Sequence, residues 1–231
     1  MDKKAVDIMW VDYHSHILPG MDDGADSPRT AVGMIDRLQR QGVEEIVLTP
    51  HYYAARESLD SFLSRREAAF RRLTEQPEAA TFPPLRLGAE VRLERDASSW
   101  EGLRELCTQG TDYLLIELPY ARYHPWMLQE IENIAYAHRV KPILAHLDRY
   151  LTTGLMTGEE AARLWEFPEG VVQLNAGVCC SLRGRLLLRR VLRAGCPVVF
   201  GSDTHNLADR APQFDRLIRA LGKRYEPLTL F

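Results

Sequence analysis

The sequence predicts an α/β protein built as one barrel of parallel strands with helices packed around it. Three observations support this class. Short apolar, β-branched runs alternate with segments of helical periodicity along the whole chain, which is the pattern of successive βαβ units. Seven such units follow one another without a long interruption. A TIM-like (β/α)7 barrel also fits a chain of 231 residues, so residues 1–231 are expected to form a single domain.

The strands are predicted where apolar runs are bounded by polar or turn-forming residues. These runs are almost continuously apolar, because a strand of a parallel barrel is buried on both faces. The seven predicted strands are Ile8–Tyr13, Glu45–Thr49, Leu85–Ala89, Tyr113–Ile116, Pro142–Ala145, Val171–Leu174 and Pro197–Gly201.

The helices are predicted from apolar residues that recur every three or four positions. The clearest one has Ser27 as its N-cap and Pro28 at its first position, and it ends at Gly42. Between the third and fourth strands, Ser98–Leu106 is the only candidate. The other predicted helices are Leu59–Leu73, Trp126–Arg139, Gly158–Trp165, Leu186–Ala194 and Asp209–Leu221.

Composition disfavours several classes of protein. The net charge of -3 argues against a general nucleic-acid-binding protein, which usually carries a basic excess. No apolar run approaches the length of about 18 residues that a membrane-spanning helix needs. The four cysteines form no CxxC pair, which argues against a disulfide framework or a zinc ribbon. We therefore expect a cytoplasmic protein that binds no nucleic acid and does not insert into a membrane.

Side chains that can bind metal ions follow six of the seven predicted strands. Because all strands of a parallel barrel end on the same face, these side chains are expected to meet at one rim, where barrel enzymes build their active sites. The sixth strand ends without a strong ligand, in Gln173 and Asn175. The candidate ligands on the other six are His14 and His16, His51, Glu90, Glu117, His146, and Asp203 with His205.

The spacing of these residues suits metal chelation. His14 and His16 are two positions apart, so both imidazoles point to the same side of a strand, and Asp203 and His205 repeat the arrangement. Mixed imidazole and carboxylate ligands suit zinc, manganese or iron rather than calcium. A single histidine pair more often satisfies hydrogen bonds in a core, and Glu90 alone could be a surface carboxylate. The six strand ends together favour a metal site.

Six segments of the chain resemble one protein family, in order and over most of its length. They are Asp12–Ala25, Thr49–His51, Gly88–Glu90, Leu115–Glu117, Ala145–Tyr150 and Gly201–Asn206. These segments look like the PHP (polymerase and histidinol phosphatase) superfamily, and within it the tyrosine-protein phosphatase branch of bacterial capsule and exopolysaccharide loci. The similarity extends from Asp12 to Arg210. Asp148 departs from it, because a glutamate is common at that position.

The resemblance implies a distorted seven-stranded barrel with up to three divalent ions, commonly manganese, although iron or zinc would also be compatible. It assigns the first ion to His14, His16, Glu90 and Asp203, the second to Glu90, Glu117 and His146, and the third to Asp23, His51 and His205. Arg149 and Arg210 match the two arginines that bind the phosphate and stabilise the transition state. The implied activity is manganese-dependent hydrolysis of phosphotyrosine on a protein. The implied substrate is the tail of a bacterial tyrosine kinase that regulates capsule or exopolysaccharide synthesis.

The charge of the candidate site agrees with a phosphate substrate. Three divalent ions would bring six positive charges, and the four carboxylates among the candidate ligands bring four negative ones. The two positive charges that remain balance a phosphomonoester, which carries about −2 at neutral pH.

Three alternatives stay open. The substrate could be histidinol phosphate or another small phosphomonoester. Cys179 and Arg185 have the C-x5-R spacing of phosphatases that use a thiolate nucleophile, after a strand and before a helix. Finally, the chain could be a non-catalytic scaffold that keeps the fold. Such a module is expected to lose ligands, whereas here all nine positions hold competent ones.

Overall fold

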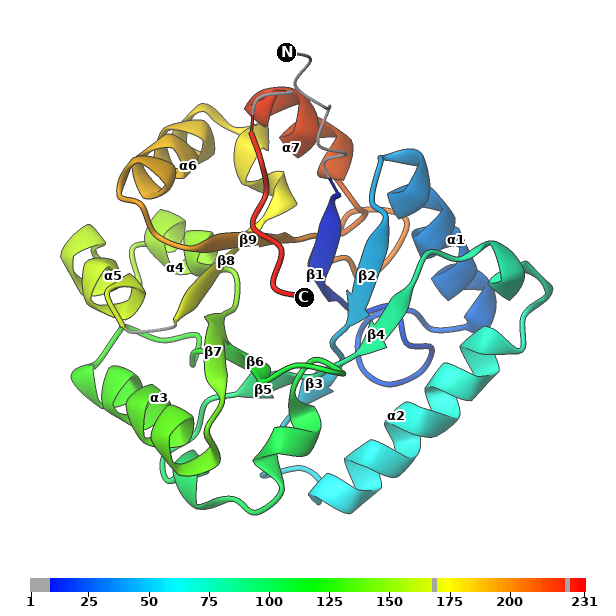
Figure 1. Cartoon of the computed structure of the whole chain (residues 1–231), viewed down its shortest axis with the longest axis horizontal. Helices are drawn as coiled ribbons and strands as arrows, with labels where there is room; N and C mark the ends of the chain where they lie inside the picture. Colours follow the sequence, from blue (N-terminus) through cyan, green and yellow to red (C-terminus); the bar gives the residue numbers. More distant parts are fainter. Residues whose placement is uncertain (1–8, 168–169, 223–224) are drawn as a thin grey trace, which may run out of the picture.

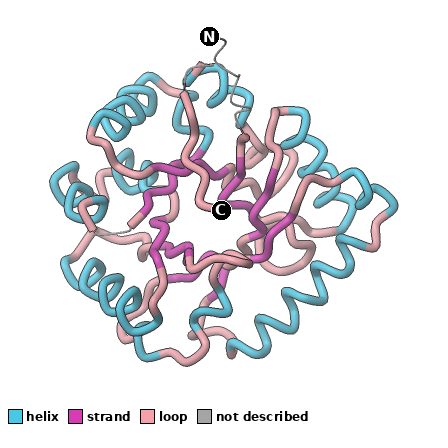
Figure 2. The backbone as a smooth tube through the Cα atoms, viewed as in Figure 1, coloured by secondary structure: helices cyan, strands magenta, loops and turns pink. Residues whose placement is uncertain are grey.

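The computed structural model describes residues 9–167, 170–222 and 225–231. Within them, a ring of strands occupies the centre and helices surround it (Figure 1, Figure 2). Ile8, the first residue of the first predicted strand, lies outside the described residues. The strands are β1 (Val11–Ser15), β2 (Glu45–Leu48), β3 (His51–Tyr52), β4 (Leu85–Leu87), β5 (Glu90–Arg92), β6 (Tyr113–Glu117), β7 (Lys141–Leu144), β8 (Val171–Asn175) and β9 (Val198–Gly201).

All paired strands run parallel. β1, β2 and β4 form one sheet, and β3, β5, β6, β7, β8 and β9 form a second sheet in that order. Two strand positions of the barrel are interrupted, because β2 and β3 are separated by Thr49 and Pro50, and β4 and β5 by Gly88 and Ala89. The second parts, β3 and β5, lie beyond the predicted strands Glu45–Thr49 and Leu85–Ala89. Pro50 has no N–H to continue the ladder, although its carbonyl still accepts from Glu90 N over 3.0 Å. The first part of each interrupted strand (β2 or β4) therefore belongs to the first sheet, and the second part (β3 or β5) belongs to the second sheet.

Contacts between β1 and the residues after β9 close the ring on its other side. Ser15 forms a parallel β-bridge with Thr204. Asp203 N donates to His14 O over 2.8 Å, and His16 N donates to Thr204 O over 3.0 Å. Seven strand positions, two of them interrupted, surround the axis in the described part of the chain. The predicted TIM-like α/β barrel is therefore confirmed, and the interruptions are its distortion.

The helices pack on the outside of the ring (Figure 1). They are α1 (Pro28–Arg40), α2 (Leu59–Thr74), α3 (Pro125–His138), α4 (Leu147–Thr153), α5 (Gly158–Trp165), α6 (Leu182–Arg193) and α7 (Phe214–Leu221). α1 begins as predicted, because the Ser27 side chain accepts from Thr30 N over 3.2 Å. α6 begins four residues before the predicted start, because Ser181 caps it by accepting from Gly184 N over 3.0 Å. α4 was not predicted.

Two other helix predictions are corrected by the structure. Ser98–Leu106 is not one helix but lies across two short 3-10 turns, because Gly102 between them has a left-handed backbone with φ of 72°. The last helix begins at Phe214 rather than Asp209. Pro212 accounts for this difference, since a proline disfavours helical backbone at the residue before it.

Apolar side chains fill both the inside and the outside of the strand ring. A large cluster of buried residues packs between the strands and the helices. The cluster inside the ring consists of Val11, Tyr13, Val47, Leu115, Ile143, Ala145, Val171 and Val199.

None of the helices in the described part of the chain has the length and hydrophobicity needed to cross a lipid bilayer.

The C-terminal segment covers the N-terminal end of the barrel. Leu230 and Phe231 pack against the interior cluster, and Leu230 N donates to the Tyr13 hydroxyl over 2.9 Å. The Phe231 ring lies 5.5 Å from the Tyr13 ring, and the Arg86 guanidinium lies 4.0 Å from the centre of the Phe231 ring. Figure 1 shows this segment running across the middle of the ring. One end of the barrel is thus closed by aromatic packing.

Candidate metal centre

The nine residues predicted as metal ligands come together at the C-terminal end of the barrel. The barrel topology produces this convergence, because strands distant in sequence end at one rim. Their donor atoms form four groups, and within each group the atoms lie within 4.8 Å of one another. The groups are His16, Asp23, His51 and His205; His14, Glu90 and His146; His14, His16 and Asp203; and His51, Glu90 and Glu117.

His14 and His16 direct both rings into the centre from the end of β1. Their Nε2 atoms lie 3.0 Å apart. His14 Nδ1 donates to Gln173 Oε1 over 3.0 Å, which leaves its Nε2 as an acceptor. His16 Nδ1 donates to Asp22 Oδ2 over 2.7 Å, with the same consequence. In their neutral forms, the two rings therefore turn lone pairs toward each other, an arrangement that a bound cation would stabilise.

Asp22 and Gln173 hold candidate ligands by hydrogen bonds that the sequence did not predict. Asp22 Oδ2 also accepts from His51 N over 2.9 Å, so one carboxylate fixes two candidate ligands. Gln173 Oε1 likewise accepts from His146 N over 2.5 Å. The sequence held a weak signal for each, since Asp22 adjoins Asp23, and Gln173 lies in the one strand that ends without a ligand.

Glu90 occupies the middle of the centre. Its Oε2 lies 3.3 Å from Nε2 of both His14 and His16, and 2.9 Å from Nδ1 of His51. Its Oε1 lies 2.9 Å from His146 Nε2. Burial acts to raise the pKa of Glu90, but the surrounding imidazoles outweigh burial and hold the pKa well below its usual range. Glu90 is therefore an ionised carboxylate at the middle of the candidate ligands.

Four buried side-chain atoms of the candidate ligands form no hydrogen bond of good geometry among the described residues, although some lie close to an oppositely charged group. They are Glu90 Oε2, His51 Nδ1, His146 Nδ1 and His205 Nε2. Leaving such an atom unpaired costs about 1–3 kcal/mol, so native structures rarely do so without a reason. Imidazole nitrogen and carboxylate oxygen are ligands of zinc, manganese and iron. The side chains present therefore fit a site for divalent cations.

Asp23 forms the open side of the centre and is 63% exposed. Its Oδ1 lies 3.6 Å from His51 Nε2 and 3.4 Å from His205 Nε2. Burial is the largest cause that lowers the pKa of His205, to about 3, so this imidazole is neutral, as a metal ligand must be. His16 belongs to the same group of donor atoms, in addition to the three residues that the resemblance implied.

Glu117 and His146 lie at the ends of β6 and β7. His146 Nε2 is 3.7 Å from Glu117 Oε1. Glu117 Oε2 accepts from Arg92 Nη1 over 3.1 Å, a contact that the sequence did not predict. The resemblance grouped Glu117 with Glu90 and His146, whereas the geometry places the donor atoms of Glu117 in one group with His51 and Glu90.

Backbone strain and close packing hold several ligands in place. His146 has φ of 32° and Asp203 has φ of 50°, both in the left-handed region that residues other than glycine rarely adopt. A Cβ at Gly201 would overlap the Cβ of His14, and a Cβ at Gly24 would overlap the backbone oxygen of His16. The glycines are therefore required for the chain to approach the two histidines of β1.

Arg149 and Arg210, the predicted phosphate-binding residues, lie beside the centre and pair with its carboxylates. Arg149 donates to Asp203 through Nη2. Arg210 donates to Asp203 Oδ1 over 3.2 Å and to Asp23 Oδ2 over 3.1 Å. Both arginines line a cavity of about 210 Å³. They are ion-pair partners in this structure, and they are placed where an anion entering the cavity would meet them.

Asp148, the residue that departs from the family pattern, has a positioning role. Its Oδ1 accepts from Asn175 N over 2.9 Å at the end of β8. Asn175 Nδ2 donates in turn to Asp203 Oδ2 over 3.1 Å. Burial raises the pKa of Asp148 to about 6. Through Asn175, this carboxyl group helps to orient a candidate metal ligand.

The surroundings of Cys179 do not support a thiolate nucleophile. The thiol is buried, and burial raises its pKa to about 11. Its Sγ donates to Ala176 O over 3.2 Å. Arg185 Nε donates to the backbone oxygen of Cys179 over 2.9 Å, and its charge lowers the pKa of the thiol by less than burial raises it. A nucleophilic cysteine needs a lowered pKa, which Cys179 does not have.

Comparison with known proteins identifies the family of this chain and several relatives. Residues 10–229 match the family model described as capsular polysaccharide synthesis, CpsB/CapC. The chain is 26% identical to the tyrosine-protein phosphatase YwqE of Bacillus subtilis (strain 168), over 93% of this chain and 85% of YwqE. It is 27% identical to the tyrosine-protein phosphatase CpsB of Streptococcus pneumoniae, over 93% of this chain and 90% of CpsB.

A solved structure shares the fold as well. It comes from the crystal structures of YwqE from Bacillus subtilis and CpsB from Streptococcus pneumoniae, which are described as metal-dependent tyrosine phosphatases. The two chains superpose with a TM-score of 0.75 and 23% sequence identity, over 94% of this chain and 87% of that one. The resemblance found in the sequence is thus confirmed, and this chain belongs to the CpsB/CapC family of capsular polysaccharide synthesis proteins.

Proposed function

We propose that this chain is a metal-dependent protein-tyrosine phosphatase and that residues 1–231 act as one phosphoesterase domain. The observation that carries this proposal is the convergence of nine metal-binding side chains around Glu90, with Arg149 and Arg210 at the same rim. The relatives YwqE and CpsB, both named as tyrosine-protein phosphatases, support the choice of phosphotyrosine as the substrate.

Up to three divalent ions are proposed for this centre, and manganese is the proposed metal, with iron and zinc also compatible with the ligand atoms. Bound divalent ions neutralise the charge of a phosphate and lower the pKa of a water molecule. The proposed holders are His14, His16, Glu90 and Asp203 for one ion; Glu90, Glu117 and His146 for a second; and Asp23, His51 and His205 for a third.

The protein's own groups would position the reactants. Asp22 and Gln173 hold the rings of His16 and His14 in the orientation that directs Nε2 into the centre. Arg149 and Arg210 present planar guanidinium groups, each of which can donate two hydrogen bonds to a phosphate. A bound phosphate would replace the carboxylates that these arginines now contact. The two guanidinium groups would then stabilise the charge that develops on the phosphate oxygens in the transition state.

For the physiological role, we propose dephosphorylation of the tail of a bacterial tyrosine kinase that regulates capsule or exopolysaccharide synthesis. The description of the family as capsular polysaccharide synthesis proteins supports this role. A cytoplasmic location is part of the proposal. It agrees with the state of the four cysteines, all of which are free thiols.

The test is turnover of three substrates by the purified chain: a phosphotyrosine peptide, a phosphoserine peptide and histidinol phosphate. Each is measured after metal removal and again after addition of manganese, iron or zinc. We expect no turnover without metal, recovery with manganese, and the highest kcat/KM for the phosphotyrosine peptide. Turnover that survives complete chelation would contradict the metal dependence. A higher kcat/KM for histidinol phosphate would instead make the chain a small-molecule phosphatase.

A further inference from the structure

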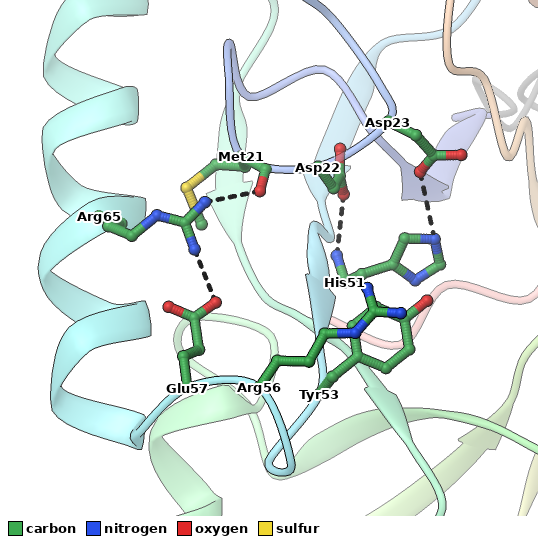
Figure 3. A pocket seen from close by; sticks show the side chains of 8 residues that line it. All are labelled: Met21, Asp22, Asp23, His51, Tyr53, Arg56, Glu57 and Arg65. Atoms are coloured by element: carbon green, nitrogen blue, oxygen red, sulfur yellow. Dashed lines mark hydrogen bonds and ion pairs between the residues drawn. The ribbon is translucent and has the colours of Figure 1, made fainter.

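A cavity of about 680 Å³ opens in front of the metal centre (Figure 3). Its inner end is formed by Asp23 and His51, which belong to the candidate metal ligands. The loop between β3 and α2 supplies its outer wall, and α2 supplies one further side chain. The residues that line the cavity are Met21, Asp22, Asp23, His51, Tyr53, Arg56, Glu57 and Arg65.

The carboxylates that line this cavity already have positively charged or N–H partners. Glu57 accepts from Arg65 Nη1 over 2.6 Å, and Arg65 also donates to Met21 O over 2.7 Å. Asp22 accepts from His16 Nδ1 and from His51 N. Asp23 accepts from Arg210. The cavity therefore offers no unpaired carboxylate to a cationic ligand.

Arg56 is different from the other charged residues of the cavity. Its guanidinium lies 4.3 Å from the centre of the Tyr53 ring and forms no ion pair among the described residues. Figure 3 shows the Arg56 side chain extended across the face of Tyr53. Stacking on an aromatic ring fixes the plane of a guanidinium while its N–H groups stay available. Arg56 is therefore an ordered cation that lacks an anionic partner.

The position of Arg56 relative to the metal centre sets what it can contact. The Tyr53 ring lies 5.2 Å from the His51 ring, and the Arg56 guanidinium lies on the Tyr53 ring. The guanidinium is therefore less than 10 Å from His51. That separation is comparable to the length of a phosphotyrosine side chain. When a phosphate reaches the metal centre, the backbone of the peptide that carries it would pass near Arg56.

We propose that Arg56, held by Tyr53, is a binding subsite for the carboxylate of an acidic residue adjacent to the phosphotyrosine. This inference rests on the proposed function and names a substrate class within it, acidic phosphotyrosine peptides. Arg56 contributes to specificity, because a neutral side chain at the same peptide position leaves the guanidinium unpaired. Arg56 is not one of the two arginines proposed to bind the phosphate. A substitution of Arg56 should therefore change the affinity for the peptide rather than the reaction at the phosphoryl group.

The experiment uses two phosphotyrosine peptides that differ only in a Glu or a Gln beside the phosphotyrosine. For the wild-type chain with manganese, we expect kcat/KM to be about fivefold higher for the Glu peptide, as for an ion pair in a partly open pocket. The difference should appear in KM, and it should shrink at high salt because ions screen this pair. Arg56→Gln should abolish the preference, and Arg56→Glu should reverse it.

Arg95→Gln is the matched control. Arg95 is also an exposed arginine stacked on an aromatic ring, 4.5 Å from the centre of Trp126, but it does not line the cavity. This variant should keep the wild-type preference. The ratio between the two peptides within one variant cancels changes in metal content or folding.

The outcomes separate the inference from the proposed function. Equal use of the two peptides by the wild-type chain, or a preference that persists in Arg56→Gln, would overturn the subsite and leave the phosphatase proposal intact. Failure of the wild-type chain to hydrolyse either peptide would overturn the phosphatase proposal itself.

Discussion

The two ends of this barrel are built on opposite principles. At the N-terminal end, Tyr13 and Phe231 pack ring to ring, and the Tyr13 hydroxyl has a hydrogen-bond partner. At the C-terminal end, buried donor atoms lack partners, and His146 and Asp203 have left-handed backbones. One end satisfies its groups internally, whereas the other leaves them ready for ligands. Substitutions at the first end should therefore change stability, and substitutions at the second should change activity.

The largest effect is expected from the double variant His14→Ala with His16→Ala. Removing both imidazoles eliminates donor atoms from three of the four groups in the centre. Turnover should fall by about a thousandfold or more, because the metals supply charge neutralisation. Elemental analysis should show lower metal content, while circular dichroism should show a folded barrel. Metal content equal to that of the wild type would remove these histidines from the site.

Asp22→Asn should weaken metal binding without removing a ligand. An amide cannot supply the charge that fixes the protonation of His16 at Nδ1, so metal affinity should fall by about 10–100-fold. Metal titration measures this change. Asp26→Asn is the control, since Asp26 is an exposed aspartate four residues away that contacts Thr30. A similar loss in both variants would point to loop destabilisation instead of metal orientation.

Arg149→Lys and Arg210→Lys test the phosphate contacts at the same end. Lysine keeps the positive charge but lacks the planar fork, so each variant should lose a charge-assisted hydrogen bond. That loss corresponds to about 1.5–3 kcal/mol, or about ten- to a hundredfold in kcat/KM. Steady-state kinetics at saturating metal measures the effect. A wild-type kcat/KM in both variants would show that these arginines form structural ion pairs and do not bind the phosphate.

Phe231→Ala tests the opposite end. The ring packs on Tyr13 and under Arg86, so its loss should lower the free energy of unfolding by about 1–2 kcal/mol. For a chain of this size, the melting temperature should fall by several degrees. kcat/KM at 25 °C should stay at the wild-type value. A large loss of kcat/KM without a change in melting temperature would show that the two ends are coupled.

The smallest effect is expected for Cys179→Ser. The high pKa of the Cys179 thiol keeps it protonated at neutral pH, so kcat/KM should change by less than about twofold. Activity should also resist alkylating reagents. Loss of turnover in a variant with full metal content would restore the thiolate mechanism as an explanation.

The barrel and the convergence of its ligands could be predicted because both follow from local pattern and topology. His14 and His16 stand two apart at the end of an apolar run, and parallel strands deliver such ends to one rim. The interruptions at Pro50 and Gly88 had signals in the sequence, a proline directly after one predicted strand and a glycine within another. The split between two sheets, however, depends on which neighbours each half pairs with.

The residues that orient the ligands could not be predicted, because their roles depend on long-range contacts. Asp22 reaches His51 only through the path of the loop after β1. Gln173 contacts a ring 159 positions away in the chain. The position of Arg56 over Tyr53 depends on the conformation of the loop before α2, which no periodicity specifies.

The left-handed backbones of His146 and Asp203 have a consequence for how this protein can change over time. Each costs about 1–3 kcal/mol, which a glycine would relieve at either position. A glycine at either position would also remove a candidate ligand, and at Asp203 it would remove the carboxylate that pairs with Arg149 and Arg210. The strain is therefore kept for the side chains that it carries into the centre, and a search for stabilising glycine substitutions should leave these two positions unchanged.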